Sequence, residues 1–241
     1  MFKKTIKILI AISLITLGIL FAGTTNSQAA KTKDPIDTSG FFTSDKAAFA
    51  FHWENIKTNN GEKNVIIFGD FQTPILEVGY PTLVKYNKDT ATINYQLTDI
   101  KGNLLAPIHT FTVKKTGSNS FKVYLDSFQT GRLPSTKGNS YTFSKTKTSP
   151  AEVYANKYSA GPLNKEFTNK LDAVVEAEYK ASLEKGENVK DPASDPNVQS
   201  SITKNAADAT AKAVEQMIVG FNTGSNQDED LSSGNVTTTN N

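Results

Sequence analysis

The chain has 241 residues and no cysteine, which excludes disulfides, thiolate metal sites and a lipid anchor on cysteine. Its 26 basic and 24 acidic side chains are interspersed and Arg132 is the only arginine, so the composition excludes the basic surface of a nucleic-acid-binding protein. A chain of this length can bury a stable core without covalent cross-links.

The first 29 residues have the pattern of a secretory signal peptide. Three lysines precede an apolar run at residues 8–22, and a small-residue cleavage motif, SQA, follows at residues 27–29. The apolar run is shorter than the ~20 residues of a membrane-spanning helix. We therefore expect cleavage after Ala29 and a secreted extracellular product with no membrane span, which would carry 23 basic and 24 acidic side chains.

The stretch LPSTKG at residues 133–138 is close to a sortase sorting signal, L-P-x-T-G. A sortase substrate carries that signal near its C-terminus, before an apolar stretch and a basic tail. Here about a hundred polar or amphipathic residues follow, and Lys137 separates the threonine from the glycine. We expect a turn between two strands at this point and no wall anchoring.

Residues 46–146 follow the period-two pattern of antiparallel strands, after a lead-in at residues 30–45 that we expect to be exposed. Alternation is clearest at residues 92–97, 121–126 and 140–144, where each run has one apolar and one polar face. Further runs between Gly, Asn and Asp turns bring the count to seven or eight strands. The sequence predicts an N-terminal antiparallel β-sandwich or small β-barrel and leaves both open.

Residues 44–57 allow two interpretations. Phe49, Trp53 and Ile56 fall at helical spacing, whereas AFHWENIK at residues 50–57 also fits the set of short strands. We expect a strand.

At Ser149 the period changes from two to 3.6. Ser149, Pro150 and Glu152 have the pattern of a capping box with proline in the first turn. This pattern predicts a short helix to about Tyr158, which Gly161-Pro162 then breaks.

The helical region continues to residue 222. An apolar stripe predicts a helix from Leu163 to about Leu183 that Gly186 ends, and a polar linker follows at residues 186–195. A last helix then carries a narrow, alanine-rich stripe up to Phe221, so the two long helices should form a closely packed antiparallel hairpin. The fold class is therefore α+β, and the polar residues 223–241 are expected to be a disordered tail.

The residues that carry chemistry give no catalytic or metal-binding constellation. His52 and His109 are the only histidines and lack metal ligands at regular spacing, so a hydrogen-bonded structural role is expected for both. Asp70 and Glu77 flank a turn and could face one groove, but other acids are equally placed. No cofactor motif occurs, and we expect neither an enzyme nor a bound metal.

Aromatic residues are the more informative class. Most of them belong in a β core, but Tyr124 lies on the polar side of its strand and Tyr80 lies in a Gly-Tyr-Pro bend. Exposed tyrosines can stack on sugars or contact proteins. Trp53, Tyr80 and Tyr124 are the candidate ligand-binding or partner-binding residues.

The sequence supports three functional hypotheses. We favour a non-enzymatic interaction module with an extracellular protein or glycan partner, since the long helical hairpin offers an apolar edge for a partner or for self-association. The alternative is a lipocalin-like barrel that carries a small apolar ligand. The stretch FHWENI at residues 51–56 resembles the early tryptophan of that superfamily over these few residues, without the usual preceding glycine. An extracellular hydrolase is third.

Overall fold

The computed structural model describes residues 36–44, 46–58, 61–97, 104–125 and 141–224. These residues belong to two compact units. Of the described residues, those up to Ser159 and those from Glu215 to Gly224 belong to the barrel unit, and residues 160–214 belong to the helical unit. The predicted signal peptide, the LPSTKG stretch and residues 225–241 of the predicted tail lie outside the described residues.

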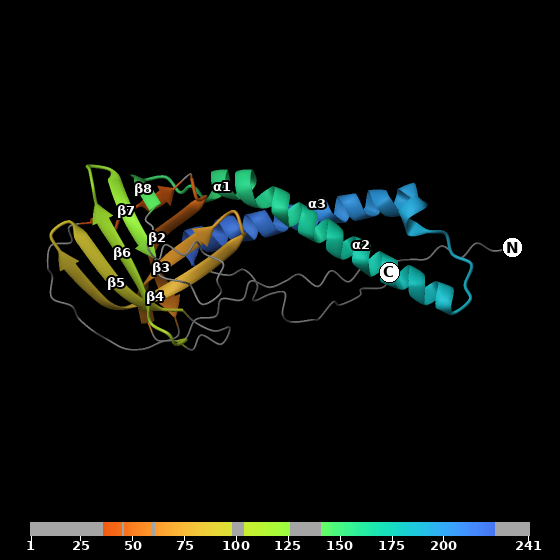
Figure 1. Ribbon diagram of the computed structural model, residues 1–241, viewed down its shortest axis with the longest axis horizontal. Coiled ribbons are helices and arrows are strands. Elements are labelled where there is room, and N and C mark those ends of the chain that lie inside the picture. Colours follow the sequence, from red (N-terminus) through yellow and green to blue (C-terminus); the bar gives the residue numbers. More distant parts are fainter. Residues whose placement is uncertain (1–35, 45, 59–60, 98–103, 126–140, 225–241) are drawn as a thin grey trace. The chain divides into compact units, whose positions relative to one another are not determined.

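Eight antiparallel strands form a closed barrel in which each strand pairs with the next along the chain and β8 pairs back with β1 (Figure 1). Their bounds are β1 Phe41–Ser44, β2 Phe49–Thr58, β3 Gly61–Asp70, β4 Ile75–Asn87, β5 Thr90–Gln96, β6 His109–Lys115, β7 Ser120–Leu125 and β8 Tyr141–Thr146. The barrel decides between the two architectures that the sequence left open. Closure also removes the two free edges that an open sheet of this order would leave.

Large apolar side chains fill the barrel interior, because alternate residues of every strand point inward. Phe51 of β2 meets Phe111 of β6 with ring centroids 4.9 Å apart, although these strands are not neighbours. The rings of Phe42 in β1 and Phe121 in β7 are also 4.9 Å apart. Side chains from opposite walls therefore touch directly. The buried cluster consists of Ile36, Phe42, Ala47, Phe49, Phe51, Ile66, Phe68, Ala91, Ile93, Tyr95, Leu97, Phe111, Val113, Phe121, Val123, Leu125 and Phe143.

Two strand segments differ from the sequence prediction. The expected exposed lead-in is wrong at Ile36, which is buried in the interior cluster, and at Phe41–Ser44, which form β1. Strand β4 begins at Ile75, so the expected Gly-Tyr-Pro bend lies within a strand. The register of β4 and β5 shifts between Pro81 and Leu83, as is typical of a strand that contains a proline.

The helical path after β8 is unbroken at Gly161-Pro162, contrary to the prediction. Helix α1 (Ala151–Tyr154) continues into the π-helical turn η1 (Ala155–Ser159) and then into α2 (Ala160–Glu184). Proline inside a helix has no N–H to donate and crowds the carbonyl four residues before it. The π-turn widens the backbone just ahead of Pro162, so the helix continues where the sequence pattern predicts an end.

The helical unit contains a helical hairpin, as predicted. Gly186 has a φ of +73° and follows the end of α2, and the turn η2 (Pro192–Ser194) leads into α3 (Pro196–Thr223). Asp195 caps α3 because its Oδ1 accepts the N–H of Asn197 at 3.0 Å. Buried positions on the two helices within this unit are Leu163, Phe167, Leu171, Val175, Ile202, Ala206, Ala209, Thr210 and Val214.

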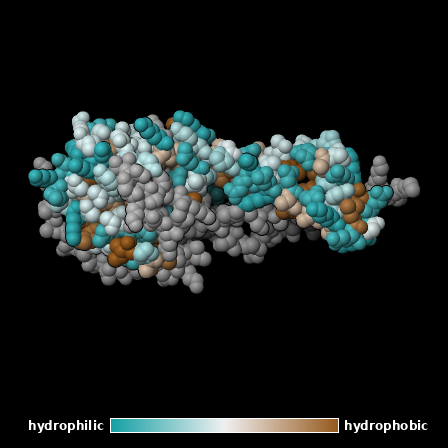
Figure 2. Space-filling view, in the orientation of Figure 1, coloured by the Kyte–Doolittle hydropathy of each residue, from teal (hydrophilic) through white to brown (hydrophobic). Residues whose placement is uncertain are grey.

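The apolar stripe of α2 is buried over only part of its length. Val175 is buried, whereas Val174 and Leu183 are 41% and 47% exposed. Figure 2 shows hydrophobic residues, in brown, at the surface of the helices. None of the helices in the described ranges combines the length and the apolar character that crossing a membrane requires.

Candidate functional site

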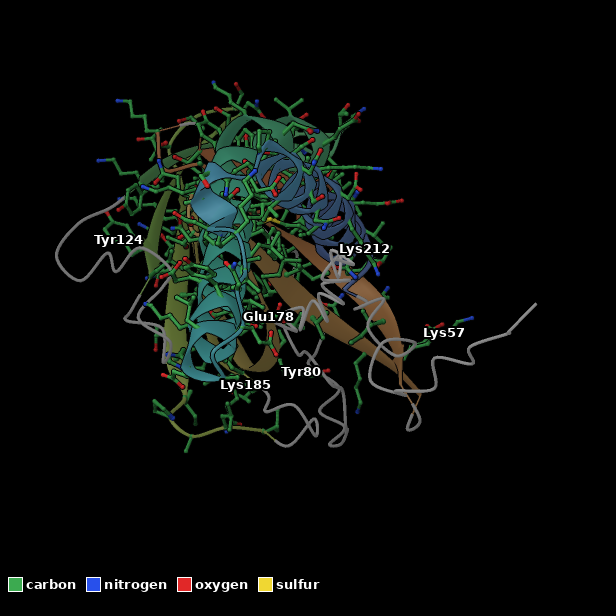
Figure 3. All side chains as sticks on the ribbon, turned by 90° about the vertical axis from the view of Figure 1, so that its right-hand side faces the viewer. Lys57, Tyr80, Tyr124, Glu178, Lys185 and Lys212 are labelled. Carbon is green, nitrogen blue, oxygen red and sulfur yellow. The ribbon has the colours of Figure 1, made fainter. Side chains whose placement is uncertain are left out.

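The three predicted site residues lie in different parts of the barrel. Trp53 is half-buried and packs inside, with its ring centroid 5.8 Å from that of Phe42 and 5.7 Å from that of Phe51. Tyr80 lies in β4 and is 9% exposed, so its predicted exposure is wrong, and burial raises the pKa of its hydroxyl to about 12. Tyr124 is 40% exposed, as predicted. Tyr80 and Tyr124 lie well apart in Figure 3, so the structure does not bring the three residues into one site.

The predicted carboxylate pair does not face an open groove, because Asp70 and Glu77 are both buried. Asp70 Oδ1 accepts the backbone N–H groups of Gln72 (3.0 Å) and Thr73 (3.3 Å), which fixes the turn between β3 and β4. Desolvation raises the pKa of Asp70, against the effect of its hydrogen bonds to Thr73 and Gln72. This geometry gives Asp70 a structural role in the turn.

A few buried polar side chains share the inner face of the barrel with the aromatic cluster. Glu77 lies opposite the inward-facing Phe68 in the β3–β4 ladder, and opposed residues point to the same face. His109 lies opposite Tyr95, and their rings stack with centroids 5.5 Å apart. Burial of an ionisable group in apolar surroundings costs free energy, so such groups are candidates for a functional role.

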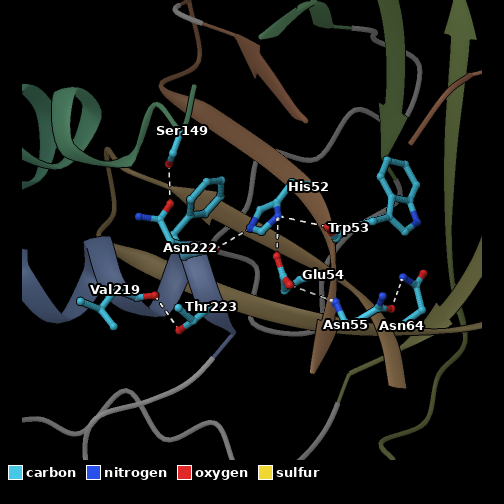
Figure 4. Close-up of polar contacts among 10 residues, drawn as sticks. His52, Trp53, Glu54, Asn55, Asn64, Ser149, Val219, Asn222 and Thr223 are labelled. Carbon is cyan, nitrogen blue, oxygen red and sulfur yellow. Dashed lines mark hydrogen bonds and ion pairs between the residues drawn. The ribbon is translucent and has the colours of Figure 1, made fainter. Parts of the chain in front are cut away.

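His52 lies on the outer face of the barrel and holds the C-terminal turn of α3 (Figure 4). It alternates with the inward-facing Phe51 and Trp53, yet it is only 2% exposed. Two aromatic rings lie beside the imidazole. The centroid of the Phe41 ring, from β1, is 4.8 Å from that of His52, and the centroid of the Phe221 ring, from α3, is 4.9 Å away. His52 Nε2 is 2.6 Å from the carbonyl oxygen of Phe221, 169 residues away in sequence.

The contacts of His52 fix its neutral tautomer. Both ring nitrogens face carbonyl oxygens, which only accept, so the neutral ring carries its proton on Nε2, whose contact with the Phe221 oxygen at 2.6 Å is the shorter one, and Nδ1 has no proton to donate. The other nitrogen, Nδ1, is 3.3 Å from the carbonyl oxygen of Trp53 and 3.9 Å from Glu54 Oε2. Desolvation lowers the pKa of His52, and the hydrogen bond to Phe221, the Glu54 carboxylate and the Trp53 carbonyl oppose this shift more weakly.

The wall of the barrel is shaped to receive the end of α3. A Cβ on Gly69 would lie 2.9 Å from Cδ2 of Phe221 and 2.7 Å from Cε2 of Phe71, so only glycine leaves room for both rings. Ser159 Oγ donates to the carbonyl oxygen of Phe71 at 2.7 Å and lies 3.3 Å from the sulfur of Met217. We call residues 217–224, which this wall receives, the α3 clasp.

Ser149 and Asn222 make a side-chain hydrogen bond that ties the clasp to the segment before α1 (Figure 4). Gly224 follows the last residue of α3 and has a left-handed conformation with φ +67°. A Cβ at this position would lie 3.0 Å from side-chain atoms of Ile56 and of Ile67. Sequence analysis expected a hydrogen-bonded role for His52, and this is confirmed. It missed the partner, since nothing near His52 in the chain indicates a contact with Phe221.

An exposed apolar surface lies on the second half of β4. The β3–β4 ladder ends at the pair Ile66 and Gly79, and β4 then continues alongside β5. Beyond that point Leu83, Val84 and Tyr86 are 45%, 37% and 37% exposed. Val84 and Tyr86 lie opposite the inward-facing Ile93 and Ala91 and so share one face of the strand, whereas Leu83, opposite Asn94, lies on the other face. We call this segment, exposed on both faces, the β4 surface. The sequence carried a signal for it, because adjacent Leu83 and Val84 break the two-residue alternation and cannot both face the interior.

The chain matches no known family model and no curated protein. Among the residues that the structure describes, no group of three or more His, Asp or Glu side chains is arranged to hold a metal ion. Functional inference therefore depends on the geometry of the barrel and its surface.

Proposed function

We propose that the protein is a secreted, non-enzymatic binding module in which a rigid barrel presents the β4 surface to an extracellular protein partner. The observation that carries this proposal is the exposure of Leu83, Val84 and Tyr86 within four consecutive positions of one strand. Single exposed hydrophobic residues are ordinary, but clustered ones that include tyrosine are typical of protein interfaces.

The packed interior supports a surface role. Phe51 and Phe111 meet across the barrel, and Phe68 lies 5.5 Å from Phe111, so a ligand at that level would have to displace a ring. A barrel filled in this way is a core that positions surface residues. The residues of the β4 surface are among the surface residues that the barrel positions.

Site-specific cross-linking tests the proposal. A photoreactive amino acid is introduced at Leu83, or at Tyr124 as a control on β7 with similar exposure, and partners from the extracellular fraction are identified by mass spectrometry. The Leu83 position should label one partner that the Tyr124 position does not label. The double variant Val84→Ser with Tyr86→Ser, whose side chains share one face, should then bind the purified partner at least about tenfold more weakly, since a loss of about 0.7 kcal/mol at each of two interface residues adds up to about 1.4 kcal/mol. Unchanged affinity would refute the assignment of the surface.

A second candidate function is the carriage of a small apolar ligand. Two observations favour it: closed eight-stranded up-and-down barrels include ligand carriers, and Trp53 is half-buried on the inner face. Saturable quenching of the fluorescence of Trp53, the single tryptophan, by fatty-acid-like probes would support this candidate. A flat response across a broad probe panel would count against it.

A further inference from the structure

We propose that His52 makes the α3 clasp a pH-sensitive contact, closed while the imidazole is neutral and loosened when the imidazole takes up a proton. The proposal is independent of the β4 surface. It rests on the contacts between β1, β2, β3 and the last turns of α3, all within the barrel unit.

The neutral ring makes one short hydrogen bond in the closed clasp and is otherwise covered by apolar side chains. Nε2–H donates to the carbonyl oxygen of Phe221, which belongs to the last turns of α3, where carbonyl groups lack a helical partner. The ring lies against Phe41 and Phe221, so apolar surface covers the imidazole from two elements. This environment accepts a neutral histidine readily and disfavours a charged one, since the closed clasp removes the water that would solvate the cation.

The polar groups beside Nδ1, the Trp53 carbonyl oxygen and the Glu54 carboxylate, favour protonation of the ring, but more weakly than burial opposes it. Phe41 from β1, Ile67 from β3 and Phe221 from α3 face His52 and carry no charge. Among the residues that the structure describes, the charged side chain recorded beside the ring is Glu54, with Oε2 3.9 Å from Nδ1. The Glu54 side chain is 39% exposed, so solvent screens its attraction for an imidazolium. Burial therefore exceeds the effect of this carboxylate.

The direction of the pH effect follows from the difference between the two states. In the open clasp the ring is solvated and titrates near the ordinary pKa of 6.5, whereas desolvation lowers its pKa in the closed clasp. The open form then binds more protons as the pH falls below 6.5, so acid favours opening. For each pH unit between the two pKa values, the ratio of open to closed clasp rises by up to about tenfold.

Opening would expose a defined part of the molecule. Phe221 would lose its packing contact with the barrel wall at Gly69. The ring of Phe71, whose centroid is 5.4 Å from that of Phe221, would become more exposed to solvent. The outer wall of β2 and β3 would then become accessible in acidic surroundings and covered at neutral pH.

Thiol accessibility measures the clasp directly, because the chain has no cysteine of its own. The Met217→Cys thiol replaces a side chain that is 4% exposed, and the Thr223→Cys thiol occupies an exposed position on the same helix. Both are reacted with 4,4′-dithiodipyridine between pH 7.5 and 5.0. The ratio of the two rates cancels most of the pH dependence of the reagent and reports the open fraction.

The rate ratio should rise several-fold toward pH 5.0 in the chain with His52 and stay flat after His52→Gln, which keeps a donor but cannot titrate. His109→Gln should leave the rise unchanged, because His109 lies on the inner face away from α3. A flat ratio with His52 present, or an equal rise after His52→Gln, would overturn the proposal.

An NMR titration of the unmodified protein gives a second measurement that needs no folded variant of the clasp. The chain has two histidines, and comparison with His109→Gln assigns their imidazole signals. The His52 signal should titrate below pH 6.5. Titration at or above 6.5 would overturn the proposal.

Discussion

Replacement of Phe51 by alanine tests whether the barrel interior is a packed core. Phe51 is 0% exposed, and its ring lies 4.8 Å from Phe42, 4.9 Å from Phe111 and 5.3 Å from Phe143. Trp53 and Phe68 add two further ring contacts at 5.7 and 6.2 Å. The substitution therefore removes ring contacts to β1, β3, β6 and β8 as well as to Trp53 in β2.

The expected cost follows from that packing. A buried Phe→Ala substitution removes about 3–5 kcal/mol from the free energy of unfolding. The five ring contacts of Phe51 place this position at the upper end of the range, since aromatic pairs add about 0.5–1.5 kcal/mol beyond their buried area. With a slope of about 2 kcal/mol per M urea, a loss of about 5 kcal/mol lowers the unfolding midpoint by about 2.5 M.

Urea unfolding followed by Trp53 fluorescence and by circular dichroism measures this cost. Phe51→Leu fills most of the space and should cost about 1–2 kcal/mol, which keeps the comparison measurable if the alanine variant is mostly unfolded. Tyr124→Ala, at a 40% exposed position, is the surface control and should change stability by less than about 1 kcal/mol. A cost below about 1.5 kcal/mol for Phe51→Ala would refute a close-packed interior and favour the carrier hypothesis.

Two further predictions concern the barrel wall. Gly69→Ala should lower the free energy of unfolding by about 1–3 kcal/mol, because its Cβ would overlap the rings of Phe71 and Phe221; an unchanged Tm would contradict this seat. The pKa of Asp37 is lowered from 3.8 to about 2, chiefly by the hydrogen bond from Lys145 Nζ and next by that from Ser39. The ionised Asp37 therefore contributes stability that is fully present above pH 3.8 and is lost as the pH falls toward 2. Asp37 is mostly exposed, so Asp37→Asn should cost less than about 1 kcal/mol at pH 7 and flatten part of the acid unfolding curve; a larger loss at pH 7 would show that solvent screens the pair less than expected.

Local patterns in the sequence were sufficient for most of the elements. Alternation along residues 92–97 and 121–126 predicts strands that the structure contains as β5 and β7, since a half-buried strand must place apolar residues on one face. Residues 44–57, where strand and helix competed, contain β2 from Phe49 onward. Gly186 and the Asp195-Pro196 pair mark helix ends because their conformation and hydrogen bonding are local properties.

Other features depended on contacts between distant parts of the chain. Pairing of β1 with β8 closes the barrel, and this pairing converts part of the expected lead-in into a strand. Tyr80 is buried within β4 although its Gly-Tyr-Pro context predicts an exposed bend, and the helix continues through Pro162 because a π-turn precedes it. Each outcome reflects tertiary packing that outweighs a local preference.

The sequence by itself determined the order of elements, the absence of thiol chemistry and the change from strands to helices near Ser149, because periodicity and composition are read along the chain. Only the tertiary structure decided that the sheet closes, that rings from opposite walls fill it, and that His52 meets Phe221 across 169 residues. The physical reason is the range of the interaction: strand and helix patterns repeat within a few residues, whereas closure and docking join residues that no local pattern connects.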